Sequence, residues 1–194
     1  MPPKQRITRE MILERSFEMF CREGMEAVNA RSVAKALNCS TQPIFSYFSG
    51  MDDLKSSLEQ KAKETFENAL MVEEMEGDPI VNIGAAYTRF SAEQPCLFTH
   101  LFMLNKDDPL YPFMNAEARR DLVQREAEYT GLPFEHAAKL YVQMSIYIHG
   151  LAAVRAAHKA EFTPEEMEKM IVNTHKLMLV SIRYCMEHPG ECEA

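Results

Sequence analysis

Apolar residues recur every three or four positions along most of this chain, which is the spacing of an α-helix with one buried face. In the first such stretch, Ile12, Leu13, Phe17 and Phe20 share a face. No sustained alternation of apolar and polar residues occurs, and no Asn-Gly or Asp-Gly turn separates apolar runs, so strands are not indicated. The sequence therefore predicts an all-α fold.

Glycine, proline and capping residues divide the periodic pattern into helices. Thr8 is the predicted N-cap of the first helix, and Gly24 suits the left-handed position after its last turn. We expect Ser40 to cap the third helix, and Ser49 with Asp52 to form a capping box for the fourth. The expected helices span about 8–23, 30–37, 41–48, 50–72, 79–93, 96–104, 113–129, 133–160 and 164–187.

The net charge of −8 is unevenly distributed. Residues 1–50 hold seven Lys/Arg and five Asp/Glu, whereas residues 51–194 hold fourteen and twenty-four. The sequence thus allows a small basic head on an acidic body. No apolar run approaches the roughly 18–20 residues that span a bilayer, and no apolar signal segment follows the basic start, so we expect a cytoplasmic protein.

Motifs for metal binding and catalysis are not found in the sequence. The five cysteines form no CxxC pair, which argues against a zinc site and a disulfide framework, and the six histidines form no HExxH. GxSxG, P-loop and strand-linked GxGxxG motifs are also missing. We therefore expect no catalytic residues, no metal and no cofactor, and a protein that is not an enzyme.

Residues 30–48 have the pattern of a helix-turn-helix, in which the second helix enters the DNA major groove. Ala34 is the small residue inside the first helix, and Asn38-Cys39-Ser40 can form the sharp turn. Polar positions remain outward on the second helix, where Gln42 is suited to adenine and the Thr41 methyl group to thymine. The spacing alone fits any two short amphipathic helices.

The same stretch resembles the DNA-binding signature of TetR-family regulators. Val33-Ala34, the Asn38-Cys39-Ser40 turn and Ile44-Phe45-Ser46-Tyr47-Phe48, continuing to Leu54, are similar to the family's Ile-Ala, Gly-Val-Ser and Leu-Tyr-x-His-Phe-x-x-Lys-x-x-Leu. The likeness covers about residues 7–58. Tyr147-Ile-His-Gly150 is similar to a further segment of many members.

Four positions depart from that signature. Phe45 replaces the usual Tyr, Tyr47 the usual His, Met51 the usual Lys, and Gln42-Pro43 the usual Gly-Thr. A hydroxyl and an ammonium that would contact phosphates are thereby lost. The predicted DNA contacts are Arg31, Thr41, Gln42, Ser46 and Tyr47, with Lys4, Arg6 and Lys55 at phosphates.

The resemblance implies a helix-turn-helix domain over 1–48 and a ligand-binding and dimerisation domain over 49–194, joined by the helix that begins at Gly50. The two last helices are the expected homodimer interface, where they would form a four-helix bundle. It also implies a repressor of a palindromic operator that a small apolar or aromatic effector releases. The candidate effector-binding residues are Phe66, Tyr87, Phe90, Phe98, Phe102, Tyr141, Met144, Tyr147 and His149.

Two alternatives stay open from the sequence. His149 is either a satisfied histidine at a helix crossing or a polar group that lines a pocket, and the aromatic residues either fill a core or bind a ligand. The whole chain is alternatively a helical dimeric interaction or ligand-binding module without sequence-specific DNA binding.

Overall fold

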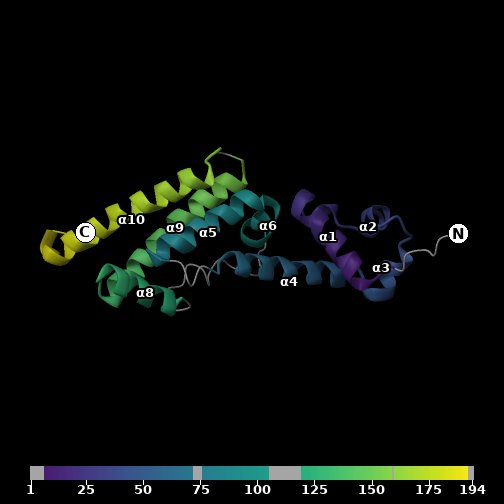
Figure 1. The fold of residues 1–194 in the computed structure, drawn as a ribbon, viewed down its shortest axis with the longest axis horizontal. Helices are drawn as coiled ribbons and strands as arrows, with labels where there is room; N and C mark the ends of the chain where they lie inside the picture. Colours follow the sequence, from purple (N-terminus) through teal and green to yellow (C-terminus); the bar gives the residue numbers. More distant parts are fainter. Residues whose placement is uncertain (1–6, 72–75, 105–118, 159, 192–194) are drawn as a thin grey trace.

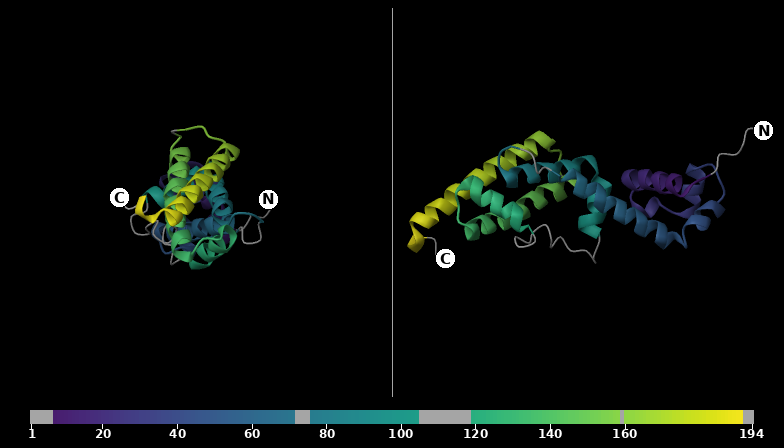
Figure 2. Two further views of the ribbon diagram at one scale, coloured as in Figure 1. Left: turned by 90° about the vertical axis from the view of Figure 1, so that its left-hand side faces the viewer. Right: turned by 60° about the horizontal axis from the view of Figure 1, so that its bottom comes forward.

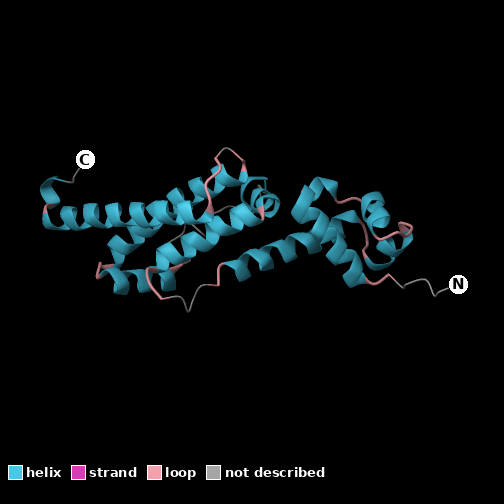
Figure 3. Ribbon diagram, turned by 45° about the horizontal axis from the view of Figure 1, so that its top comes forward, coloured by secondary structure: helices cyan, strands magenta, loops and turns pink. Residues whose placement is uncertain are grey.

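The computed structural model describes residues 7–71, 76–104, 119–158 and 160–191. Within these ranges the chain consists of helices and the loops between them, and no strand occurs (Figure 3). The molecule is elongated, with a small helical head at one end and the end of the last helix at the other (Figures 1 and 2). The expected all-α architecture is confirmed.

The head contains three helices, which are α1 (Arg9–Glu23), α2 (Ala30–Ala36) and α3 (Gln42–Tyr47), and the short 3-10 turn η1 (Met25–Ala27). Thr8 caps α1 as expected, because its hydroxyl accepts the Met11 N–H at 3.2 Å. Gly24 ends the helix with a φ of 84°, a conformation that favours glycine. The buried core residues of the helix-turn-helix are Val33, Ala34, Ile44 and Phe48.

The start of α3 differs from the expectation. The helix follows Thr41 rather than a Ser40 cap, and no side chain caps it. Asn38 has a φ of 50°, so the turn closes through a left-handed residue. Thr41 already has helical torsion angles, and its backbone therefore lacks the extended geometry that a capping side chain needs.

Helix α4 (Met51–Ala69) runs from the head to the body (Figure 1). Leu54, Leu58 and Ala62 form its buried face at a four-residue spacing. Asp53, not Asp52, reaches back to Ser49, whose backbone N–H lies 2.8 Å from the Asp53 carboxylate. The helix starts at Met51 with Gly50 as its N-cap, which places Asp53 at the third helical position.

The body contains α5 (Pro79–Glu93), α6 (Pro95–Thr99), the π-helical turn η2 (His100–Leu104), α8 (Arg120–Thr130), α9 (Phe134–Ala156), α10 (Pro164–Glu187) and the turn η3 (Pro189–Glu191). Helix α5 is the central element and packs on α9 and α10. Gly84 allows this close approach, because a Cβ there would lie 2.6 Å from Ile148 Cδ1. Thr163 and Glu166 form a capping box at the start of α10.

Two other expectations have a partial outcome. Part of the helix expected over 113–129 lies outside the described residues, and α8 extends from Arg120. Cys21, Cys39 and Cys96 are free thiols, whereas Cys185 is disulfide-bonded, although the cysteine spacing argued against a disulfide framework. In the described part of the chain, every helix is too short or too polar to cross a membrane.

Candidate nucleic-acid interface

Helix α3 lies on the outside of the head and carries no charged residue. Gln42, Ser46 and Tyr47 are exposed, and they line a groove of about 790 Å³ together with the turn at 38–40. The Ser46 hydroxyl donates to the Gln42 carbonyl oxygen at 3.0 Å, whereas the Gln42 side chain is exposed. An exposed carboxamide on a short outward helix is suited to the edge of a base.

Tyr47 connects α3 to the chain that precedes α1. Its hydroxyl donates to the Ile7 carbonyl oxygen at 3.2 Å. The segment that enters α1 therefore lies beside α3. Among the other predicted contacts, Arg31 is exposed on α2, and Thr41 and Lys55 are half-buried. Lys4 and Arg6 lie outside the described residues.

Phe45 is a residue of this face that the sequence analysis did not include among the contacts. Its side chain is 52% exposed on α3, although its neighbour Ile44 is completely buried. The ring lies beside the exposed Ser46, so it forms part of the outward surface of α3. The helical spacing gave a signal for this, because residues 44 and 48 share the buried face and residue 45 turns away from it.

Two cations stack on aromatic rings, one within the head and one between α4 and the head. The Arg9 guanidinium lies 4.8 Å from the centre of the Phe48 ring, and the Lys61 ammonium lies 4.9 Å from that of Phe17. Helix α1 also packs against α6 of the body. The orientation of the head is thus determined by α4 and α6 together.

The structure brings six of the nine predicted effector-binding residues into one aromatic cluster, with ring centres 4.8–6.2 Å apart. These are Phe66, Tyr87, Phe90, Phe98, Phe102 and His149. Tyr141 and Met144 are buried on α9, and Tyr147 is half-buried there. Since the rings are in direct contact, a ligand among them would have to move them apart.

His149 lies in this cluster with a defined hydrogen bond. Burial lowers the pKa of the His149 imidazole and raises the pKa of the Tyr87 hydroxyl, so both groups are neutral at pH 7. The Tyr87 hydroxyl oxygen lies 3.0 Å from His149 Nδ1, and the two groups share a hydrogen bond. The arrangement satisfies the histidine at a helix crossing and also places a polar pair inside an apolar cluster.

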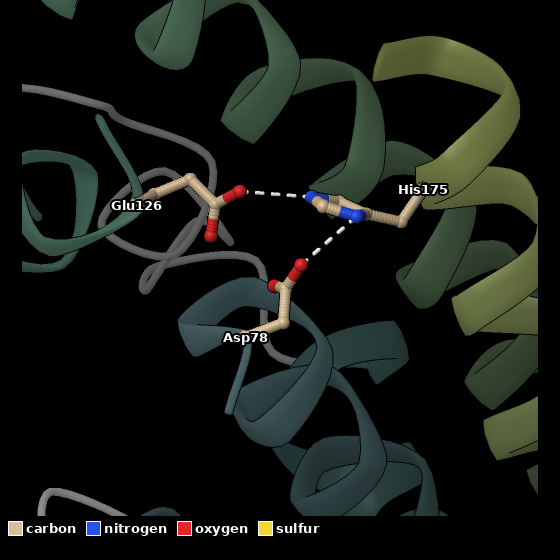
Figure 4. A group of neighbouring side chains, drawn as sticks. All are labelled: Asp78, Glu126 and His175. Carbon is tan, nitrogen blue, oxygen red and sulfur yellow. Dashed lines mark hydrogen bonds and ion pairs between the residues drawn. The ribbon is translucent and has the colours of Figure 1, made fainter. Parts of the chain in front are cut away.

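A buried charged group that sequence reasoning missed lies at the other end of α5. His175 on α10 lies between two carboxylates, with Nδ1 2.9 Å from Asp78 Oδ2 and Nε2 2.8 Å from Glu126 Oε1 (Figure 4). Burial alone disfavours the imidazolium, but hydrogen bonds to Asp78 and Glu126 raise the pKa of His175 to about 9. At neutral pH the ring therefore donates to both acids.

These three residues are also the one group among the described residues with the ligand types and spacing for a metal ion. Each imidazole nitrogen faces a different carboxylate, so the donors do not converge on a single point (Figure 4). The carboxylates also accept N–H groups at the start of α5, Asp78 from Val81 and Glu126 from Ile80. The positive end of a helix stabilises anions rather than a cation, so the geometry favours an ion-pair network.

Helices α9 and α10 expose an apolar surface, which we call the α9/α10 stripe. On α9, Ile146 and Val154 are exposed at an eight-residue spacing, with Gly150 between them. On α10, Leu177 and Val180 are 72% and 67% exposed, and Tyr184 follows one turn later. Large apolar side chains this exposed on two helices that pack together are typical of a protein–protein interface.

A short outward helix that follows a supporting helix and a tight turn is the geometry of a helix-turn-helix motif. The chain is similar in structure to a transcriptional regulator from Rhodococcus sp. Rha1, with a TM-score of 0.53 at 17% sequence identity, over 90% of this chain and 97% of that one. At this identity the likeness establishes the fold alone, and it agrees with the all-α fold expected from the sequence.

Two TetR regulators are more distant. The TetR family transcriptional regulator PfmR from Thermus thermophilus has a TM-score of 0.48 at 18% identity, over 90% of this chain and 97% of its own. A regulator of the TetR/AcrR family from Thermobifida fusca has a TM-score of 0.45 at 18% identity, over 88% and 96%. No protein-family profile and no curated protein sequence matches the chain.

Proposed function

We propose that this protein is a TetR-type transcriptional regulator that binds a palindromic operator as a homodimer through α3. The observation that carries the proposal is the outward surface of α3, where Gln42, Ser46 and Tyr47 are exposed over a buried helix-turn-helix core. Such a regulator acts in the cytoplasm on double-stranded DNA and has no enzymatic role. The 1–48 segment is the DNA-binding domain of this proposal, and 49–194 the effector-binding and dimerisation domain.

Recognition of the operator base sequence would depend on a few side chains. Gln42 can form a bidentate hydrogen bond with adenine, while Thr41, Ser46 and Tyr47 contact neighbouring bases or phosphates. Arg31 and Lys55 would neutralise phosphates, and so would Lys4 and Arg6, because Arg6 directly precedes the segment that Tyr47 holds beside α3.

Dimerisation would come from the α9/α10 stripe. One small head makes few DNA contacts, whereas two heads related by a two-fold axis read both halves of a palindrome. A two-fold axis through the stripe would pair α9 and α10 with their symmetry mates in a four-helix bundle. The exposed Gly150 between Ile146 and Val154 would let the helices approach closely.

Effector release would act through the aromatic cluster. An apolar or aromatic ligand that separates the rings around Tyr87 would displace Phe66, which belongs to α4. Since α4 also carries the head, this displacement would move the head out of its DNA-binding position. The ligand would therefore bind the dimer with displaced heads more tightly than the DNA-competent dimer, and its binding would release the operator. This proposal makes the protein a repressor.

The test is operator binding by the Gln42→Ala variant. An operator is first selected from random DNA duplexes with the purified protein, and affinities are then measured by fluorescence anisotropy for it and for single-base variants. We expect Gln42→Ala to weaken the free energy of operator binding by roughly 1–3 kcal/mol. The variant should also lose its base preference at one position in each half-site. Gln124→Ala on α8 is the matched control and should bind as wild type.

Uniform binding of all base variants by the wild-type protein would instead support the alternative, a helical dimeric module without sequence-specific DNA binding. Wild-type specificity retained in Gln42→Ala would refute only the role of Gln42.

A further inference from the structure

Helix α3 presents one free hydrogen-bonding side chain to the outside. The exposed Gln42 carboxamide makes no hydrogen bond within the described part of the chain. The Ser46 hydroxyl, by contrast, donates to the Gln42 carbonyl oxygen at 3.0 Å. The Tyr47 hydroxyl donates to the Ile7 carbonyl oxygen at 3.2 Å. Both hydroxyl protons are therefore engaged inside the head, and the Gln42 amide is the free donor of this helix.

The rest of the outward surface is largely apolar. The rings of Phe45 and Tyr47 are 52% and 41% exposed. Pro43 is half-buried and lines the groove beside α3, together with the half-buried Leu37 and Cys39. A polar base edge placed against such a surface would lose its water without gaining a hydrogen bond, whereas a methyl group would be buried there without that cost.

Charged side chains are missing from the whole turn and from α3. No Lys, Arg, Asp or Glu occurs between Asn38 and Met51. Guanine is most often recognised by Arg or Lys, and the cytosine amino group by Glu or Asp. The exposed cations Arg31 and Lys35 belong to α2, the helix that crosses the DNA backbone in a helix-turn-helix. Helix α3 thus lacks the charged side chains that usually recognise a G·C pair.

The two parts of this surface match the two bases of an A·T pair. In the major groove, adenine offers one donor and one acceptor that a carboxamide can bind together, and thymine offers a methyl group. We infer that the base pairs facing α3 are A·T pairs, with Gln42 bound to adenine and Phe45 packed on thymine methyl groups. This inference rests on the proposed operator binding and specifies the bases that are recognised.

Such recognition has a distinctive dependence on salt. Contacts with phosphates release counterions, so they weaken as the salt concentration rises, whereas packing on a methyl group involves no charge. The ratio of affinities for operators with and without a thymine methyl group should therefore stay constant over a salt series, while both affinities fall.

Operators with altered bases test the inference on the wild-type protein. In the operator selected from random duplexes, the position whose preference Gln42→Ala relaxes should be an A·T pair. Uracil in place of one contacted thymine removes only the methyl group and should weaken binding about fourfold, which corresponds to the burial of one methyl-sized group. Adenine with carbon in place of N7 at the Gln42 position should weaken binding about three- to tenfold. Uracil outside the half-sites is the control and should change nothing.

The assignment of Phe45 has its own variant. Phe45→Ala should bind the thymine and uracil operators with nearly equal affinity, whereas Tyr129→Ala, an exposed aromatic residue on α8, should keep the fourfold difference. Thermal melts verify that both variants are folded. A uracil effect as large in Phe45→Ala as in the wild type would overturn the role of Phe45.

Failure of the inference is distinguishable from failure of the proposed function. A G·C pair at the position that depends on Gln42, or an unchanged affinity for every uracil operator, would overturn the inference while specific operator binding stands. Equal affinity of the wild type for all duplexes would overturn the inference and the proposed function together.

Discussion

The imidazole of His175 joins three helices through two hydrogen bonds, to Asp78 at the start of α5 and to Glu126 on α8. All three side chains are mostly or completely buried, with Glu126 at 0% exposed. Removing the ring leaves two carboxylates close together in a low-dielectric interior. Such uncompensated charges are costly, whereas the intact network is balanced by the N–H groups of α5.

We therefore expect His175→Ala to lower the free energy of unfolding by about 3–5 kcal/mol. His188→Ala, at the exposed end of α10, should change it by less than about 0.5 kcal/mol. Urea unfolding followed by circular dichroism measures both. A loss below about 1 kcal/mol in His175→Ala would mean that the network contributes little.

The same network predicts how stability depends on pH. The pKa of His175 is raised to about 9 in the folded chain, from an ordinary value of 6.5. A raised histidine pKa stabilises the fold fully below pH 6.5, and this contribution is lost as the pH rises through 9. Urea midpoints of the wild type should fall between pH 6.5 and 9, while those of His175→Gln stay nearly level. Parallel curves for the two proteins would contradict this assignment.

At the scale of elements, periodicity and caps were sufficient to predict most helices. Thr8, Asn29 and Thr163 lie where helices begin, and Gly24 lies where α1 ends. The short α3 was placed correctly but its start was not, because the cap depends on backbone torsion angles that sequence spacing does not reveal. Six of the candidate effector-binding residues do gather, since helical spacing directs them to one core.

The features that the sequence could not predict depend on contacts between residues far apart in the chain. His175 and Glu126 are 49 positions apart, and neither lies in a motif. Local patterns determine which face of a helix is apolar, but they do not determine which helix end meets which.

The exposed ring on α3 gives an element-scale prediction. Phe45→Ala should leave the melting temperature unchanged within about 2 °C, because the ring is 52% exposed, yet weaken operator binding about tenfold through lost contact with thymine methyl groups or sugars. Tyr129→Ala, an aromatic residue 57% exposed on α8, is the matched control. Operator affinity by anisotropy is the measurement, and an unaffected affinity would exclude Phe45 from the interface.

The α9/α10 stripe gives a second prediction at the scale of elements. Leu177→Glu should raise the dimer dissociation constant at least about 30-fold, because a two-fold axis through the stripe would bury each new carboxylate against apolar residues of the other subunit. Met71→Glu is the control, since Met71 has the same 72% exposure but lies at the end of α4. Sedimentation velocity distinguishes monomer from dimer. A dimer as stable in Leu177→Glu as in the wild type would place the interface elsewhere.

On the scale of the whole molecule, the chain is an outward helix-turn-helix head attached to an acidic body through α4 and α6. Basic residues outnumber acidic ones in residues 1–50, whereas residues 51–194 hold the excess of acids. This distribution directs the head rather than the body toward a polyanion.

The central claim is that two copies of the chain bind one palindromic operator specifically. The measurement that tests it most directly is the mass and affinity of the protein complex with the selected operator, by light scattering and anisotropy, over a series of salt concentrations. The account predicts two protomers per duplex and binding at least about 1,000-fold tighter than to a scrambled duplex. It also predicts that the logarithm of the association constant falls steeply and linearly with the logarithm of the salt concentration. One protomer per duplex, or equal affinity for the scrambled sequence, would contradict it.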